Sequence, residues 1–152
     1  MPFTHHVDVR YLEVDQQGVV FNMWYLAYLD DAMTGLLAHG GLGYPDLLAQ
    51  GWDVQLVHTE LDWVGPLRWG EPGEVDVALA RVGTTSFTLQ FAVRVGDRPV
   101  CTAATVYVAV ETTGWTKVPV PDVLLAALGP VGPLPPSPAA PPGSGVERSR
   151  PA

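Results

Sequence analysis

Four consecutive β-strand tracts, the last three of them joined by very short connections, constrain this chain more than any other feature. Each tract is rich in Val, Thr, Leu or Phe, and the four span residues 53–64, 74–83, 85–95 and 99–110. The run GTT at 83–85 links the second tract to the third, and Asp97, between Gly96 and Arg98, links the third to the fourth. Because such short connections join antiparallel neighbours, the sequence predicts an antiparallel meander.

A single long helix is predicted ahead of the meander, over residues 23–38. Its apolar side chains recur at helical spacing and form one stripe made of Tyr25, Leu29, Ala32, Met33, Leu36 and Leu37. Asn22 is the predicted N-cap, since its side chain can accept a hydrogen bond from a free amide in the first turn. The glycine-rich run at 39–43 ends the helix. The helix carries few polar residues, so we expect the rest of the fold to enclose most of it.

The order of the elements predicts an α+β domain. A first strand over 5–14 precedes the helix, and a short last helix is predicted over about 120–128. One apolar helix beside one antiparallel sheet must pack against that sheet, which is the only surface able to cover it. The predicted domain spans 1–128. The remaining segment, 129–152, has eight prolines among 24 residues and is predicted to be a disordered tail.

Composition excludes several classes of partner. Sixteen acidic residues against eight basic ones give a formal net charge of -8, which argues against nucleic-acid binding and against docking on anionic membranes. Cys101 is the single cysteine, so neither an internal disulfide nor a cysteine-rich zinc site is expected. We expect a cytoplasmic protein, because the N-terminus lacks the pattern of a signal peptide and no apolar run reaches the length of a membrane span.

The segment from Asp15 to Asn22 is the candidate site. The first strand is expected to end at Asp15, and the helix opens after Asn22. Helix N-termini carry unpaired N–H groups, which can hold a carbonyl oxygen as it becomes an oxyanion. A carboxylate in the preceding loop could attack that carbonyl or activate a water. Gly18 allows the backbone to turn tightly and to approach a ligand closely. Together these features outline an acyl-transfer site.

The same residues resemble the 4-hydroxybenzoyl-CoA thioesterase family of the hotdog superfamily, in its bacterial acyl-CoA thioesterase branch. The resemblance rests on a strand, then Asp15, then the run GVVFN at 18–22, and Tyr25 within the helix. Two weaker similarities are the run LDWVGPLRWGE at 61–71 and the run GTTSF at 83–87. The resemblance covers about residues 5–128.

The resemblance implies a hotdog fold, in which a five-stranded antiparallel sheet wraps around one long helix. It implies an acyl-CoA thioesterase that hydrolyses an acyl or aryl thioester to free acid and CoA, with Asp15 as nucleophile or general base. The backbone N–H of Asn22 would polarise the thioester carbonyl, with Gly18 shaping the loop and Tyr25 and Ser86 touching substrate. A homodimer or homotetramer is implied, with no metal and no organic cofactor.

Three alternatives stay open at the level of sequence. A hotdog dehydratase needs a histidine near the loop and helix, and none lies between His6 and His39. A non-catalytic acyl-CoA-binding module would not need Asp15. An acyl-carrier-protein thioesterase would have to bind a carrier protein, which is commonly acidic, although this chain is itself acidic and like charges repel.

Several other polar residues have ordinary structural interpretations. Glu13 is expected to be solvated on the sheet surface, and so is the strand face that carries His58, Glu60 and Asp62. Cys101 is expected to be a buried small hydrophobic residue. The hairpin at 83–86 lacks the basic residues with which several family members meet CoA phosphates. Arg68, Arg81 and Arg94 are the remaining candidates for phosphate binding.

Overall fold

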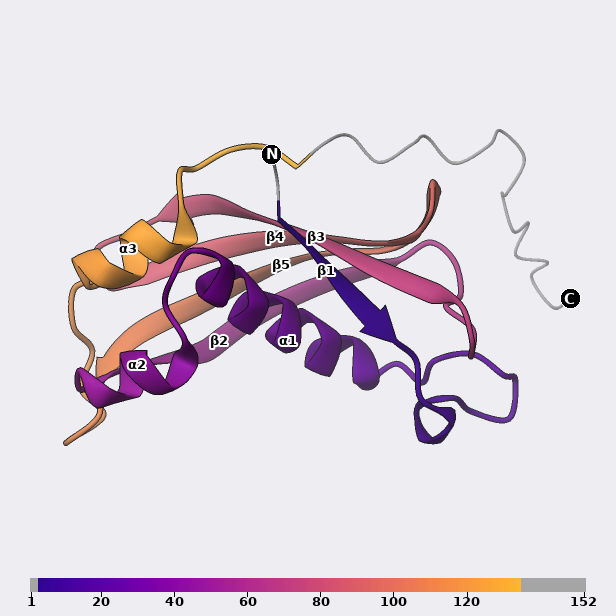
Figure 1. Ribbon diagram of the computed structural model, residues 1–152, viewed down its shortest axis with the longest axis horizontal. Helices are drawn as coiled ribbons and strands as arrows, with labels where there is room; N and C mark the ends of the chain where they lie inside the picture. The colour runs from indigo at the N-terminus through magenta and orange to yellow at the C-terminus, as the bar shows by residue number, and fades with distance from the viewer. Residues whose placement is uncertain (1–2, 135–152) are drawn as a thin grey trace, which may run out of the picture.

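A computed structural model describes residues 3–134 of the chain (Figure 1). The strands are β1 (Phe3–Asp8), β2 (Trp52–Trp63), β3 (Pro72–Val82), β4 (Ser86–Val95) and β5 (Arg98–Glu111). The helices are the single 3-10 turn η1 (Tyr11–Glu13), the long helix α1 (Trp24–His39), and the short helices α2 (Tyr44–Ala49) and α3 (Asp122–Leu128). The predicted strand tracts and the long helix are confirmed to within one or two residues at most boundaries. The predicted four-strand meander is correct only for β3, β4 and β5, because β2 pairs with β5 and the place beside β3 is taken by β1.

The five strands form one antiparallel sheet in the order β1-β3-β4-β5-β2. The sheet curves around α1, which lies across its inner face with α2 and α3 at one end (Figure 1). The predicted α+β hotdog architecture, a five-stranded antiparallel sheet around one long helix, is therefore confirmed. The two edge strands differ in length: β1 has six residues and β2 has twelve.

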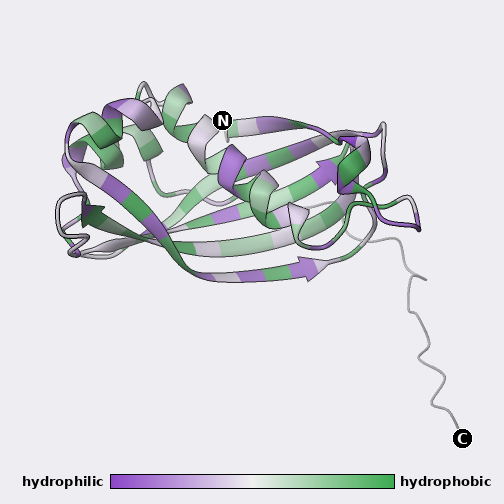
Figure 2. Ribbon diagram, turned by 90° about the horizontal axis from the view of Figure 1, so that it is seen from below, coloured by the Kyte–Doolittle hydropathy of each residue, from purple (hydrophilic) through white to green (hydrophobic). Residues whose placement is uncertain are grey.

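The core lies between α1 and the inner face of the sheet. Alternate residues of β4 point inward and are buried, and these are Phe87, Leu89, Phe91 and Val93. All six residues of the predicted helical stripe are buried against them. Figure 2 shows how apolar and polar residues alternate along the strands. Leu37 is completely buried, and truncating a residue in that position to Ala typically costs about 2–5 kcal/mol.

The first strand is shorter than predicted, and Asp15 does not end it. β1 stops at Asp8, whose partner in the register is Pro72, the first residue of β3. Beyond this pair β3 offers no further residue, and a proline has no N–H to continue the ladder. The chain then makes the turn η1 and enters the loop that carries Asp15.

The segment after α3 still contacts the sheet. Val131 forms a parallel bridge with Leu79, and the Gly132 N–H donates to the Leu79 carbonyl at 3.0 Å. The Gln90 side chain of β4 donates to the Gly132 carbonyl at 3.0 Å. The boundary predicted after residue 128 thus falls within a segment that contacts β3 and β4. The rest of the predicted tail, 135–152, lies outside the described residues.

Candidate active site

Asp15 lies in a tight loop that folds back on itself. Val14 and Val20 form an antiparallel bridge, and the Asp15 N–H donates to the Val19 carbonyl at 2.9 Å. The Gly18 N–H donates to the Asp15 carbonyl at 2.9 Å, and Gly18 has φ of 75°. A residue with a side chain is strained in that conformation, so glycine at 18 suits the turn for a local reason. The loop fixes the position of the Asp15 backbone.

One carboxylate oxygen of Asp15 is held, which orients the group. The Gln17 N–H donates to Oδ1 at 2.8 Å. Within the described residues Oδ2 has no hydrogen-bond partner. The side chain is half-buried, so it is neither solvated on all sides nor enclosed. A carboxylate held by one oxygen, with the other accessible, can attack a carbonyl carbon or accept a proton from water.

The start of α1 differs in detail from the prediction. Its N-cap residue is Met23, and no side chain caps the helix, so the predicted capping by the Asn22 side chain is wrong. The cause is a turn that precedes the helix, in which the Trp24 N–H donates to the Phe21 carbonyl and the Tyr25 N–H to the Asn22 carbonyl. Within the described residues the backbone N–H groups of Asn22 and Met23 have no protein acceptor. These exposed donors lie where a substrate oxygen would need them.

Glu13 holds the Asp15 loop and the helix together. Its side chain is buried, with the residue only 3% exposed, so the expected solvated position is wrong. The Tyr28 hydroxyl of α1 donates to Oε1 at 2.9 Å, and the Arg10 N–H donates to the same oxygen at 2.9 Å. The Arg10 guanidinium binds Oε2 at 2.9–3.0 Å. The Phe21 N–H donates to the Glu13 carbonyl at 2.9 Å, which places the residue before Asn22 beside Glu13.

The charge of Glu13 is stabilised by its donors. Burial would raise the pKa of this carboxyl, but the hydrogen bonds from the Arg10 backbone and the Tyr28 hydroxyl outweigh burial and hold the pKa below its usual value. Burial raises the pKa of the Tyr28 hydroxyl, and the hydrogen bond that it donates to Glu13 raises it further. Glu13 is therefore ionised and holds the loop in place. Because both of its carboxylate oxygens already accept hydrogen bonds, it is poorly placed to exchange a proton with substrate.

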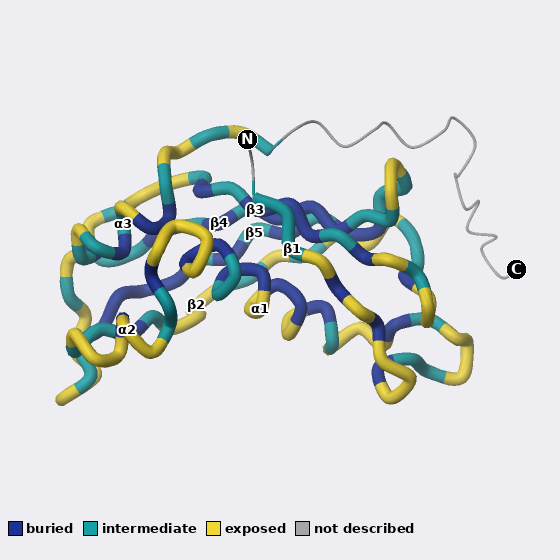
Figure 3. The backbone as a smooth tube through the Cα atoms, in the orientation of Figure 1, coloured by how far each residue is buried: buried dark blue, intermediate teal, exposed yellow. Residues whose placement is uncertain are grey.

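Exposed apolar side chains surround the Asp15 loop. Tyr11 is 74% exposed and packs edge-on against Trp69, which is 59% exposed, with ring centroids 5.3 Å apart. Other exposed apolar residues of the same loops and of the helix start are Leu12, Phe21, Met23, Leu26, Trp63 and Val64. In Figure 3 this end of the molecule and the middle of β2 carry long exposed segments. Apolar surface in this amount, around polar donors, is typical of a ligand-binding or subunit-contact region.

Tyr25 and Ser86, the two predicted substrate-binding residues, lie in different parts of the fold. Tyr25 is buried at the start of α1, and its ring packs edge-on against Trp63 at 5.8 Å. Ser86 is the first residue of β4 and lies beside the end of β3. The Asp15 loop lies near the other end of β3, because Val19 of this loop forms a bridge with Arg68, which precedes β3 in the chain. The length of β3 separates the two ends by about 33 Å. One chain therefore brings Asp15, Gly18, Asn22 and Tyr25 together and leaves Ser86 apart.

The three arginines considered for phosphate binding differ in whether they already form ion pairs with carboxylates. Arg94 binds Asp76 at 2.7 Å and Glu74 at 3.1 Å, so this candidate for phosphate binding is already paired. Arg68 lies 4.0 Å from Glu71 and its side chain is 57% exposed. Arg81 is exposed at the end of β3 and forms no ion pair within the described residues. Arg68 and Arg81 are thus better placed than Arg94 to bind the CoA phosphates.

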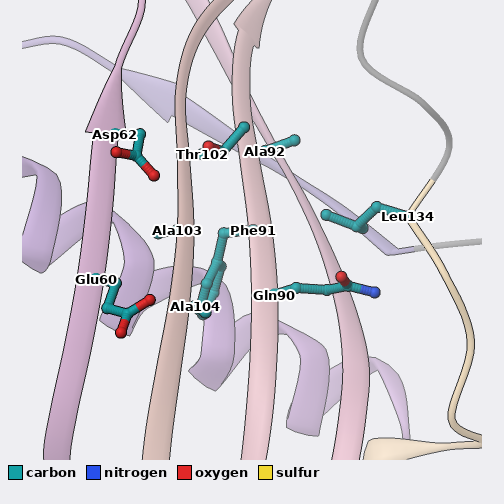
Figure 4. A pocket seen from close by; sticks show the side chains of 9 residues that line it. All are labelled: Glu60, Asp62, Gln90, Phe91, Ala92, Thr102, Ala103, Ala104 and Leu134. Atoms are coloured by element: carbon teal, nitrogen blue, oxygen red, sulfur yellow. The ribbon is translucent and has the colours of Figure 1, made fainter.

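A shallow cavity of about 360 Å³ lies on the opposite face of the sheet from α1 (Figure 4). Its lining includes Glu60 and Asp62 of β2 and the Gln90 amide, which binds Gly132. His58 and Glu60 on this strand are exposed and lie 3.1 Å apart, which confirms the expected solvated face. Two carboxylates at the opening would repel the phosphates of CoA, so this cavity is a poor substrate site.

Cys101 is buried on β5, as expected, and only 1% exposed. Burial, with Asp62 nearby, raises the pKa of its thiol to about 12. A thiol in this state is not a nucleophile at neutral pH. Within residues 3–134 no cluster of three or more His, Cys, Asp or Glu is arranged to hold a metal ion. No helix in the same part of the chain is long and apolar enough to cross a membrane.

Comparison with known proteins identifies a family. The sequence model of the Thioesterase-like superfamily matches residues 9–128. A 1,4-dihydroxy-2-naphthoyl-CoA hydrolase of Synechococcus elongatus is 25% identical over 116 residues, which cover 75% of this chain and 85% of the relative. A protein of Aquifex aeolicus, provisionally described as an esterase, is 27% identical over 119 residues, which cover 78% of this chain and 93% of the relative. The crystal structure of a hypothetical protein from Aquifex aeolicus superposes with a TM-score of 0.80 at 26% identity, covering 84% of this chain and all of the other.

Proposed function

Since this chain belongs to the Thioesterase-like superfamily and is a thioester hydrolase, we propose that it hydrolyses acyl-CoA and that Asp15 is its catalytic residue. The observation that carries the proposal is the Asp15 carboxylate, held through one oxygen by the Gln17 N–H beside a helix start with unpaired N–H groups. The named relatives that act on CoA thioesters support the class of substrate. Within this superfamily we propose membership of the 4-hydroxybenzoyl-CoA thioesterase family, on the motif from Asp15 to Tyr25.

The chemistry follows from this geometry. The thioester carbonyl lies over the start of α1, and its oxygen accepts a hydrogen bond from the Asn22 N–H, which stabilises the oxyanion as it forms. Asp15 either attacks the carbonyl carbon, forming a mixed anhydride that water then hydrolyses, or takes a proton from the water that attacks. In both routes the C–S bond breaks, CoA leaves as the thiolate, and the acyl group ends as a free acid.

We propose that a homodimer completes the site. The edge strand β2 has an exposed middle, where Leu56 and Val57 are 47% and 55% exposed. An unpaired edge of this length is a template for pairing with a second strand. If two β2 strands pair antiparallel about a two-fold axis, the start of one β2 lies beside the end of the other. That arrangement brings the Ser86 end of one chain toward the Asp15 end of its partner.

The dimer also suggests how CoA is held. Arg81 and Ser86 would approach from one subunit, and Arg68 from the subunit that supplies Asp15. These exposed arginines would offset the acidic net charge locally and bind the CoA phosphates. A homotetramer would be a further assembly of this dimer. The proposed compartment is the cytoplasm, which the single, buried Cys101 supports.

The first test is thiol release from a panel of short, medium, long and aryl acyl-CoAs by wild type and Asp15→Asn. We expect release by wild type and a loss of about 100-fold or more in kcat for the variant, with KM little changed. Asp62→Asn, which alters an exposed aspartate on the outer face, is the matched control and should retain full activity. Equal rates for Asp15→Asn and wild type would place the chemistry elsewhere.

Further measurements separate the alternatives. An acyl adduct of Asp15, caught in a quenched single turnover by mass spectrometry, would assign the nucleophilic route. Release from acyl-carrier protein but from no acyl-CoA would favour the carrier-protein thioesterase. Acyl-CoA binding without release would indicate a non-catalytic module.

The dimer is tested by substitution on β2. Val57→Lys should yield monomers by light scattering and lose activity, whereas Val131→Lys, at an exposed site far from β2, should do neither.

A further inference from the structure

Two exposed aromatic rings lie beside the Asp15 loop and contact each other. Tyr11 of η1 and Trp69 pack edge-on with ring centroids 5.3 Å apart, and both residues are more than half exposed. Two large aromatic side chains that meet at the surface leave apolar area in contact with water. A planar ligand that stacks on one ring and touches the edge of the other would bury this area.

Both rings belong to segments that are fixed to the rest of the fold. Tyr11 lies between Arg10 and Glu13, and the buried Glu13 carboxylate accepts a hydrogen bond from the Arg10 N–H at 2.9 Å. Trp69 lies two residues after Leu67, which is completely buried. Because these neighbours hold the two aromatic side chains in place before any ligand arrives, little conformational freedom is lost when a ligand stacks on them.

Hydrogen bonds and an ion pair fix the loop that carries Trp69. The Arg98 guanidinium donates to the Glu71 carboxylate and to the Pro66 carbonyl, both at 2.6 Å. The Arg68 N–H donates to the same Glu71 carboxylate at 3.0 Å. The Arg68 guanidinium is 4.0 Å from Glu71 and more than half exposed, whereas Arg98 binds Glu71 closely. Arg68 can therefore still bind an anion beside the two rings.

The backbone joins this loop to the Asp15 loop. Val19 and Arg68 form an antiparallel bridge, and the Val20 N–H donates to the Leu67 carbonyl at 2.8 Å. The Asp15 N–H donates to the Val19 carbonyl, so the segment with Val19 lies between Asp15 and Arg68. Since neighbouring strands are about 4.8 Å apart, the backbone of Arg68 lies about 10 Å from that of Asp15.

An aromatic pair beside an arginine has the chemistry of a nucleotide-binding site. Aromatic rings stack on a base, and a guanidinium binds phosphate oxygens. The proposed acyl-CoA substrate carries both groups, adenine and phosphates, at the far end of its pantetheine arm. An aryl acyl group could also stack on the rings, but it carries no phosphate for Arg68. The adenine nucleotide of CoA is therefore the better match.

We propose that Tyr11 and Trp69 bind the adenine ring of CoA, and that Arg68 binds its phosphates. This nucleotide subsite belongs to the same chain as the Asp15 to which the thioester is delivered. It makes the CoA portion of the substrate, and not the acyl portion alone, a determinant of specificity. The inference rests on the proposed function, because it takes the substrate to be a CoA thioester.

Calorimetry with free CoA and with pantetheine, which lacks the nucleotide, tests the subsite without catalysis. Trp69→Ala should weaken CoA binding by about 5- to 100-fold, the usual effect of removing one aromatic ring from a base, and should leave pantetheine binding unchanged. Trp69→Phe keeps a ring and should recover most of the affinity. Trp115→Ala is the matched control. Trp115 is similarly exposed but follows the end of β5, which pairs with the start of β2, whereas Trp69 follows the end of β2, so this variant should bind CoA like wild type.

Hydrolysis provides a second measurement. The same acyl group is offered on CoA and on N-acetylcysteamine, which lacks the nucleotide. The ratio of the two kcat/KM values should fall in Trp69→Ala, through a higher KM for the CoA thioester, and should stay as in wild type in Trp115→Ala.

The outcomes separate the subsite from the proposed function. CoA binding that depends on Trp69, in a protein that hydrolyses no thioester, would support the subsite and refute the proposed function. CoA binding that is absent in wild type or unchanged in Trp69→Ala would overturn the subsite, whether or not Asp15 hydrolyses thioesters. A lower molecular mass of Trp69→Ala in light scattering would also overturn it, because a second copy of the chain would then be what covers the ring.

Discussion

Removing the Glu13 carboxylate should uncouple the Asp15 loop from α1. In Glu13→Ala the buried Tyr28 hydroxyl and the Arg10 N–H both lose their acceptor. The unpaired hydroxyl costs about 1–3 kcal/mol, and the emptied volume adds to that. The Arg10 side chain is 62% exposed and can turn to water, so its lost ion pair contributes at most about 1 kcal/mol. We expect the free energy of unfolding to fall by about 3–4 kcal/mol.

A double-mutant cycle isolates the hydrogen bond between helix and loop. Tyr28→Phe alone should cost about 1–2 kcal/mol, because Glu13 keeps its donors from Arg10. In Glu13→Ala with Tyr28→Phe the phenylalanine has no hydroxyl to leave unpaired. The double variant should therefore be more stable than the sum of the single effects predicts, by about 1–2 kcal/mol. Urea unfolding, followed by tryptophan fluorescence at one protein concentration, measures all four proteins.

The cycle has a clear contrary result. If the two single effects add to within about 0.5 kcal/mol, Glu13 and Tyr28 act independently, and the buried carboxylate does not couple the loop to the helix. Activity provides a second measurement. Tyr28→Phe should lower kcat more than it raises KM, because it loosens the position of Asp15 without touching substrate. An unchanged kcat would mean that the loop is held by its own turn alone.

Three further predictions concern the rest of the fold. Cys101 should react with a thiol reagent only after unfolding, since burial raises the pKa of its thiol to about 12; fast labelling of native protein would contradict this. Gly40→Ala should destabilise the fold by about 2 kcal/mol or more, because its Cβ would lie 2.0 Å from the Ala127 carbonyl oxygen, whereas Gly132→Ala meets nothing within 4 Å and should be neutral in thermal unfolding. Burial would raise the pKa of Asp76, but hydrogen bonds from Arg94 and Thr4 hold it below its ordinary value. Asp76 therefore stabilises the fold at neutral pH and loses this contribution as the pH falls below about 4, so Asp76→Asn should differ most from wild type near pH 7, and a gap that widens in acid would refute the assignment.

The elements that the sequence predicts well are those with local causes. The stripe of α1 and the alternation in β4 record which side chains must face the core, so periodicity alone finds them. The helix ends at the predicted glycine run because Gly41, with φ of 89°, permits the turn in which the Leu42 N–H donates to the Leu37 carbonyl. None of these features depends on residues far along the chain.

The features that sequence reasoning missed depend on distant partners. Glu13 looks like a surface residue of a strand because its acceptor role is set by Tyr28, fifteen positions later. The first strand ends early because its neighbour β3 begins at Pro72, sixty-four positions after Asp8 along the chain. Asn22 does not cap the helix because a turn begins at Phe21, whose N–H donates to the Glu13 carbonyl. The first two errors trace to partners fifteen and sixty-four positions away, and the N-cap error traces to a turn whose position depends on a backbone contact with Glu13, eight positions earlier.

The division of the candidate site follows from the same topology. Asp15, Gly18, Asn22 and Tyr25 are close in sequence and the fold keeps them together, so a local motif can identify them. Ser86 lies at the other end of β3, about 33 Å away, and no rearrangement of an intact sheet can close that distance within one chain. If Ser86 contacts substrate, a second chain must supply it. A mixture of Asp15→Asn and Ser86→Ala chains should then form heterodimers with one site free of both substitutions, and recovered activity on mixing would place the two residues in one site across the subunit boundary.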